Sequence, residues 1–125
     1  MEFTISRNTF LKSLSHAYGI IEKKTTLPIL SNILIEAKDS KIRITATDLD
    51  IIYTEAIPLQ ELKKEGSTTT SASIFYDILR KLTANSKIEF TLVDKKKIKL
   101  ESGNSRFNLP CMSPEDFPLS NEDFT

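Results

Sequence analysis

The side chains that could do chemistry are few and do not form a recognisable catalytic set. Asp48 and Asp50 lie two residues apart in the segment ATDLD, Ala46 to Asp50. Two carboxylates on one strand face suit acid–base catalysis or a divalent cation, but either use needs partner groups from elsewhere, and the sequence identifies none. We interpret the pair as a strand-end turn. A small hydrolase that uses it is one of the alternatives.

Other nucleophiles and metal ligands are equally isolated. The chain has one cysteine, Cys111, and one histidine, His16, which leaves too few ligands for a zinc site and no internal disulfide. No serine lies in a nucleophile-elbow pattern, and the three glycines form no phosphate-binding loop. The sequence thus predicts no catalytic residue, no metal, no cofactor and no enzymatic activity.

Basic residues indicate a different chemistry. Lys12 lies on the polar side of a first predicted helix, Lys23 and Lys24 follow it, and Arg80 lies on the polar side of a second predicted helix. If the helices pack side by side, these cations face the same way and suit sequence-independent contacts with phosphates. The alternative is that these cations are scattered over the surface as solvated charges and share no binding face.

Composition describes one ordinary globular domain. A chain of 125 residues is long enough to bury one core and too short for two domains. With 39% hydrophobic and 27% charged residues, it has the balance of a globular protein. The 17 basic residues balance 17 acidic ones, but four acids and no Lys or Arg lie in the last thirteen positions, so the first 112 residues carry net +4. This charge permits nucleic-acid binding. No apolar run reaches about 20 residues and no secretion signal begins the chain, so we expect a cytoplasmic protein.

Residue periodicity predicts elements that would position these groups. A strand containing Phe3 and Ile5 precedes a helix that Ser6 can cap and Gly19 can end. The rest of the first half is expected to form strands at 30–37, 41–46 and 49–57, followed by a loop at 61–66.

The second half begins with a short strand at 67–71, which leads into a helix from a Ser71 cap to about Leu82. Its strands are expected around 88–92, 98–100 and 106–109, before a loop-like segment after Pro110. Each half then reads strand, helix, three strands, which favours an α+β fold with an antiparallel sheet covered on one face by a helix pair. Ile74 and Ile78 lie to the side of the second helix, which indicates either burial on two sides or a lateral contact with another domain or subunit.

Several segments, taken together, resemble the amino-terminal domain of the bacterial DNA polymerase III beta subunit, the sliding clamp. They are MEFTISRNTFLKSL, KTTLPILSNILIE, ITATDLD, SIFYDILRKL, and SGNSRFNLP followed by EDFP. The resemblance covers essentially residues 1–125 and implies the DNA clamp fold, in which a chain has three such domains and two chains close head-to-tail around duplex DNA. It implies that this chain is the first third of a longer protein, with 113–125 as a tail or linker.

The resemblance also implies roles for individual residues on the DNA side. Lys24, just before TLPIL, would contact DNA, and the polar helix faces with Lys12, His16 and Arg80 would line the central hole. Ser73 departs from the family pattern, because relatives commonly carry a basic residue there.

A second set of residues would meet the third domain of a neighbouring subunit: Ile74, Ile78, Arg106, Phe107 and Leu109. Ile74 and Asn104 stand where relatives can carry charged residues, so we expect a more apolar interface. Polymerase and clamp loader would bind through domains outside this chain. The implied function is a non-enzymatic processivity factor; the alternative is a stand-alone protein-interaction domain that uses the apolar edge at Ile74, Ile78 and Phe107.

Overall fold

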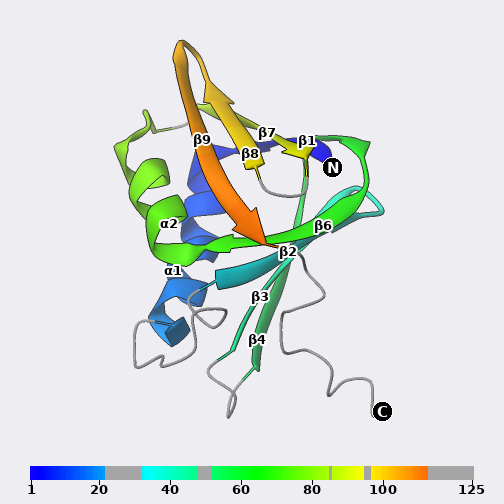
Figure 1. Cartoon of the computed structure of the whole chain (residues 1–125), viewed down its shortest axis with the longest axis vertical. Coiled ribbons are helices and arrows are strands. Elements are labelled where there is room, and N and C mark those ends of the chain that lie inside the picture. The colour runs from blue at the N-terminus through cyan, green and yellow to red at the C-terminus, as the bar shows by residue number, and fades with distance from the viewer. Residues whose placement is uncertain (22–31, 48–51, 85, 95–96, 113–125) are drawn as a thin grey trace.

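The structure is a computed structural model that describes residues 1–21, 32–47, 52–84, 86–94 and 97–112. Two helices, α1 (Arg7–Ile21) and α2 (Ala72–Lys81), lie side by side against one side of a curved antiparallel sheet (Figure 1). The predicted α+β fold with a helix pair over one sheet face is confirmed. The strands are β1 (Glu2–Ser6), β2 (Asn32–Lys38), β3 (Lys41–Thr47), β4 (Ile52–Pro58), β5 (Glu61–Lys64), β6 (Gly66–Ser71), β7 (Lys87–Asp94), β8 (Lys97–Ser102) and β9 (Ser105–Met112).

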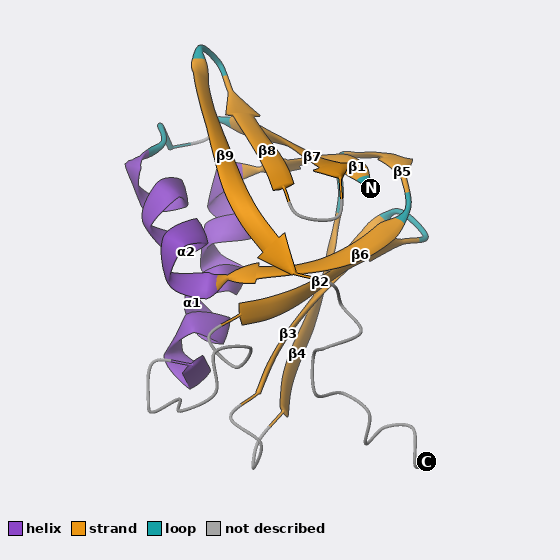
Figure 2. Ribbon diagram, in the orientation of Figure 1, coloured by secondary structure: helices purple, strands orange, loops and turns teal. Residues whose placement is uncertain are grey.

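The two halves of the chain exchange strands. The sheet order is β4-β3-β2-β6-β9-β8-β7-β1-β5, with every neighbouring pair antiparallel (Figure 2). β1 of the first half pairs with β7 of the second, and β6 of the second half pairs with β2 of the first. Neither strand–helix–three-strand unit therefore completes its sheet alone.

Four phenylalanines form the centre of the core and join both halves. Phe3 of β1 stacks on Phe90 of β7 with ring centroids 4.6 Å apart, and Phe10 of α1 meets Phe75 of α2 edge-on at 4.9 Å. All four side chains are at most 1% exposed. Because a buried aromatic side chain contributes about 1.5–3 kcal/mol, this cluster fixes both helices on the sheet.

The expected loop at 61–66 is wrong, because Glu61–Lys64 forms the edge strand β5. It pairs with β1, where Phe3 is opposite Leu62, and Leu62 packs against the core. The other residues of β5 are exposed, as is usual for an edge strand. A strand with one inward apolar residue shows no alternating pattern in the sequence.

Two other boundaries differ from expectation. α1 continues past Gly19 to Ile21, since one glycine in a last helical turn costs only about 1 kcal/mol. β9 continues past Pro110 to Met112, because Pro110 lies where β9 changes partner from β8 to β6 and its carbonyl accepts a hydrogen bond from Thr70 Oγ1 at 2.8 Å.

The remaining predicted elements are confirmed within the described residues. The Ser71 hydroxyl accepts a hydrogen bond from the Ile74 amide at 3.3 Å and so caps the N-terminus of α2. Leu82 is the C-cap residue of this helix. The β2–β3 hairpin turns at Asp39 and Ser40, which both have positive φ, as a two-residue turn of type I′ requires. The expected strand starts at 30–31 and 49–51 lie outside the described residues.

Candidate nucleic-acid interface

The exposed face of the helix pair carries a groove between α1 and α2. Lys12 is exposed there, on the side of α1 opposite buried Phe10 and Leu14, as the helical pattern predicts. The groove brings together cationic, amide and hydroxyl side chains, which suit contacts with a sugar–phosphate backbone. The groove is lined by Arg7, Asn8, Leu11, Lys12, Ser15, Tyr76 and Ala84.

Arg7 joins the start of α1 to the end of α2. Its Nε donates to the Leu79 carbonyl at 2.9 Å and its Nη2 to the Arg80 carbonyl at 3.2 Å. Carbonyls in the last helical turn lack their usual amide donor one turn further on and carry a partial negative charge. The Arg7 guanidinium therefore caps α2 and offsets its dipole, together with the Leu82 amide, which also donates to the Leu79 carbonyl at 3.3 Å. Sequence reasoning missed Arg7, because its partners lie more than seventy residues away.

Tyr76 joins α2 to α1 at the groove. Its ring stacks on that of Tyr18 in α1, with centroids 4.9 Å apart and planes 23° apart, and the guanidinium carbon of Arg80 is 5.4 Å from its centroid. Arg80 also approaches Asp77, with Nη2 3.4 Å from Oδ1. Tyr76 thus lies against Arg80 and lines the same groove as Lys12, so the two cations that the sequence placed on separate helices are on one side of the helix pair.

His16 is engaged by β4 at the other side of α1. Its Nδ1 lies 3.2 Å from the Tyr53 hydroxyl and 3.3 Å from Glu55 Oε1. Ser13 Oγ donates to the same Glu55 oxygen at 3.0 Å, and the Tyr53 hydroxyl donates to it as well. His16 therefore faces the Glu55 carboxylate of β4.

The environment of this cluster shifts two pKa values. Burial, together with the hydrogen bond to Glu55 and its negative charge, raises the pKa of Tyr53 to about 12. The hydrogen bond from Tyr53 is the main cause that lowers the pKa of Glu55; desolvation opposes it, and His16 and Ser13 support it. Glu55 is consequently a stable anion beside α1 at neutral pH.

Some predicted site residues have no described position. Lys24 and Lys23, and the acidic residues Asp48 and Asp50, lie outside the described residues. Their proposed roles remain predictions from sequence.

On α2, the predicted subunit-interface residues lie at the side of the helix. Ile74, in the first turn of α2, is 43% exposed, an unusual degree for a large apolar side chain on a helix that buries Phe75 and Leu79. Ile78, one turn further, is half-buried against the core. The structure thus leaves an apolar side chain on the surface where the sequence predicts a lateral contact.

On β9 the predicted residues differ in exposure. Arg106 is exposed and its Nε donates to Glu101 Oε2 of β8 at 3.0 Å. Phe107 is half-buried against the core, whereas Leu109 is only 1% exposed and belongs to the core. The Leu109 side chain is therefore not part of this surface, and its contribution is to hold β9 in place.

One edge of β9 is open along most of its length. Ser105 to Pro110 pair with β8, and only Cys111 and Met112 pair with β6, opposite Thr70 and Thr69. Within the described ranges, the other edge from 105 to 109 has no strand partner. An open edge next to a half-buried aromatic side chain is suited to pairing with a strand of another chain.

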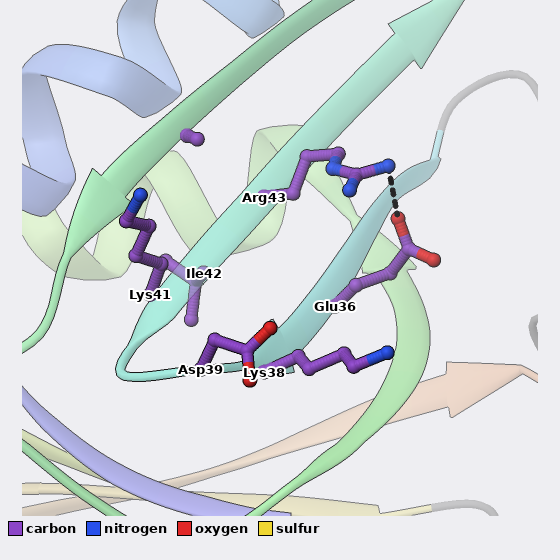
Figure 3. Close-up of a pocket in the computed structure, with 7 residues that line it drawn as sticks. Glu36, Lys38, Asp39, Lys41, Ile42 and Arg43 are labelled. Atoms are coloured by element: carbon purple, nitrogen blue, oxygen red, sulfur yellow. Dashed lines mark ion pairs between the residues drawn. The ribbon is translucent and has the colours of Figure 1, made fainter.

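The outward face of the β2–β3 hairpin has a hollow with mixed charges (Figure 3). Glu36 Oε1 and Arg43 Nη1 lie 3.9 Å apart across it. Across the part of the chain that is described, no three His, Cys, Asp or Glu side chains gather as a metal site would require, and no helix could span a membrane. The hollow is lined by Glu36, Lys38, Asp39, Lys41, Ile42, Arg43 and Ala56.

A helix pair that covers one face of a curved antiparallel sheet, with cations on its exposed side and an open strand edge beside an apolar side chain, defines a domain of the sliding-clamp type. The family model for the DNA polymerase III beta subunit, N-terminal domain, matches residues 1–121, and the chain belongs to this family. The resemblance noted from the sequence is thereby confirmed.

Relatives and solved structures agree with this assignment. The beta sliding clamp of Caulobacter vibrioides is 36% identical to this chain over 125 residues. The beta sliding clamp of Pseudomonas putida is 34% identical over 122 residues. Each match covers 98% of this chain and 33% of the relative. A crystal structure of the sliding clamp of Bartonella birtlesii bound to griselimycin superposes with TM-score 0.87 at 39% identity, covering 94% of this chain and 31% of that one. The Caulobacter crescentus pol III beta structure gives 0.88 at 35% identity, with 95% and 32% covered. The chain thus spans about a third of the length of these relatives.

Proposed function

We propose that this chain is the N-terminal domain of a ring-shaped sliding clamp, a processivity factor that encircles duplex DNA and tethers the replicative polymerase. The observation that carries the proposal is the family match over residues 1–121 combined with the superposition on solved clamps. The protein acts in the cytoplasm without an enzymatic activity or cofactor of its own. In this proposal residues 1–125 are the first of three domains, with 113–125 as a tail or linker.

The helical face is the DNA-facing surface in this proposal. Lys12 lines the groove, Arg80 lies against Tyr76, and His16 lies at the side of α1. Lys24 would join them from the segment after α1. A closed ring stays on DNA because it cannot diffuse off sideways. Its inner surface therefore needs only weak phosphate contacts that exchange during sliding.

The apolar edge is the subunit interface in this proposal. Ile74 and Ile78 on α2, with Arg106 and Phe107 on the open edge of β9, would meet the third domain of a second subunit, head-to-tail. Leu109 would support the edge from the core. Polymerase and clamp loader would bind domains outside these 125 residues.

Binding of the 125-residue chain to a short duplex tests the proposal. We expect weak association that falls steeply as salt rises and does not depend on sequence, measured by fluorescence anisotropy. Tight, salt-insensitive or sequence-selective binding contradicts it. The alternative, a stand-alone interaction module that uses the apolar edge, is favoured if the open reading frame stops directly after Thr125; two further domains of similar size support the clamp.

A further inference from the structure

Tyr76 is held in a fixed position on the exposed helical face. Its ring stacks on Tyr18 across the α1–α2 contact, and its half-buried side chain packs against the core. A stacked aromatic pair is stabilised beyond burial alone, so the contact with Tyr18 holds this ring in place on the surface. It also lines the groove that contains Lys12.

Arg80 uses this ring as a platform. Its guanidinium carbon lies 5.4 Å from the Tyr76 centroid, while its side chain is 55% exposed. A guanidinium resting on an aromatic ring keeps N–H groups at its edge available for a phosphate fork. Because a free arginine side chain loses much rotamer entropy when it binds, an arginine already placed by a ring binds at lower cost.

We propose that Tyr76 is a positioning residue for the phosphate contact of Arg80, so that the two act as one element of the DNA-facing surface. The neighbouring Asp77, whose Oδ1 is 3.4 Å from Arg80 Nη2, competes with the phosphate and keeps the contact exchangeable. Both partners of this ion pair are more than half exposed, so the pair is weak and a phosphate can displace it. The inference rests on the proposed DNA contact.

A double-mutant cycle tests the coupling, with the 125-residue chain and a labelled short duplex at low salt. Tyr76→Met removes the ring but keeps bulk and helix propensity. We expect it to weaken binding about threefold in the wild-type background and to have no further effect when Arg80→Gln is already present. Tyr76→Phe, which keeps the ring, is the matched control and should bind like the wild type. The proposal is overturned if Tyr76→Met lowers the affinity for the duplex equally in the wild-type and Arg80→Gln backgrounds. It is also overturned if Tyr76→Met leaves the affinity of the wild type unchanged.

Arg80→Lys gives a second test that leaves the core untouched. It keeps the charge but removes the planar fork, so we expect about twofold weaker binding with little change in salt slope. Unchanged affinity for this variant overturns the proposal, even if Tyr76→Met does not fold by circular dichroism. If the wild type itself shows no salt-dependent binding, the proposed DNA contact fails instead, and the two failures are thus distinguished.

Discussion

The hydroxyl of Tyr53 donates a hydrogen bond to the carboxylate of Glu55, two residues further on the same face of β4. Ser13 donates to the same oxygen from α1, and His16 lies 3.3 Å from it. One carboxylate therefore ties the end strand of the sheet to the helix above it.

Glu55→Gln should lower the free energy of unfolding by about 1 kcal/mol at pH 7, because the carboxylate is the stronger acceptor in this cluster. The pKa of Glu55 is lower in the folded chain than in the unfolded one. Its stabilising contribution is therefore complete above the unfolded pKa and disappears as the pH falls through the folded pKa. Urea unfolding from neutral to acidic pH should show the difference from wild type shrinking, with Asp77→Asn as an exposed control. A difference that stays constant with pH would contradict this account.

Tyr53 should titrate late in an ultraviolet absorbance titration of the folded chain. Its pKa is raised to about 12 from an ordinary value of about 10, so the protonated phenol favours the folded state. This contribution is present below the ordinary pKa and is lost as the pH rises towards 12. Tyr53→Phe should remove the late step, and Glu55→Gln should move it to lower pH. A late step that survives in Tyr53→Phe belongs to another residue.

Arg7→Met should destabilise the chain by about 1–2 kcal/mol, since two carbonyls at the end of α2 lose a charged donor. Lys12→Met on the exposed face of the same helix is the matched control and should change stability by less than about 0.5 kcal/mol. Chemical denaturation of both variants gives the comparison. Equal effects would mean that the Arg7 bonds to α2 contribute nothing.

Two glycines should respond to alanine in opposite directions. Gly103 has φ +59°, so Gly103→Ala should destabilise by about 1 kcal/mol, although the added methyl group would meet no atom within 4 Å outside the adjacent residues. Gly19 lies within α1 with equal space around it, so Gly19→Ala should stabilise by up to about 1 kcal/mol. Thermal unfolding of the two variants measures these changes. A shift of the melting temperature in the same direction for both variants contradicts the conformational argument.

In a full-length ring that carries this domain, Phe107→Ala should speed ring opening, because burial of a large side chain at an interface contributes a few kcal/mol, typically about 2–4. Dimer dissociation in analytical ultracentrifugation measures this. Val93→Ala, an exposed apolar side chain on β7 outside the proposed interface, is the control. A ring as stable as wild type removes Phe107 from the interface.

The helices and most strands were predictable because their buried residues recur at the regular spacing of a helix or a strand. Phe10 and Leu14 repeat at helical spacing, and Ile42 and Ile44 alternate along a strand. β5 was missed because its single inward residue, Leu62, leaves no pattern. Its strand character comes from the free edge of β1, which is a tertiary feature.

The site was predictable only where a local pattern exists. Helical periodicity placed Lys12 and Arg80 on exposed faces, but the stacking of Tyr18 on Tyr76 depends on how α1 meets α2. Similarly, nothing within α1 indicates that His16 meets Glu55, because the contact depends on how α1 lies over β4. The sequence did contain one usable signal for Tyr76, namely an aromatic residue four positions before an arginine on the polar side of a helix.

The exchange of strands between the two halves has a consequence during synthesis. Phe3 in β1 pairs with Phe90 in β7, 87 residues later in the chain. At ribosomal speeds of about 5–20 residues per second, the nascent chain waits several seconds before its aromatic cluster can close. During that interval apolar side chains of the first half are open to chaperones, and no truncated product that ends before β7 can reach the native state.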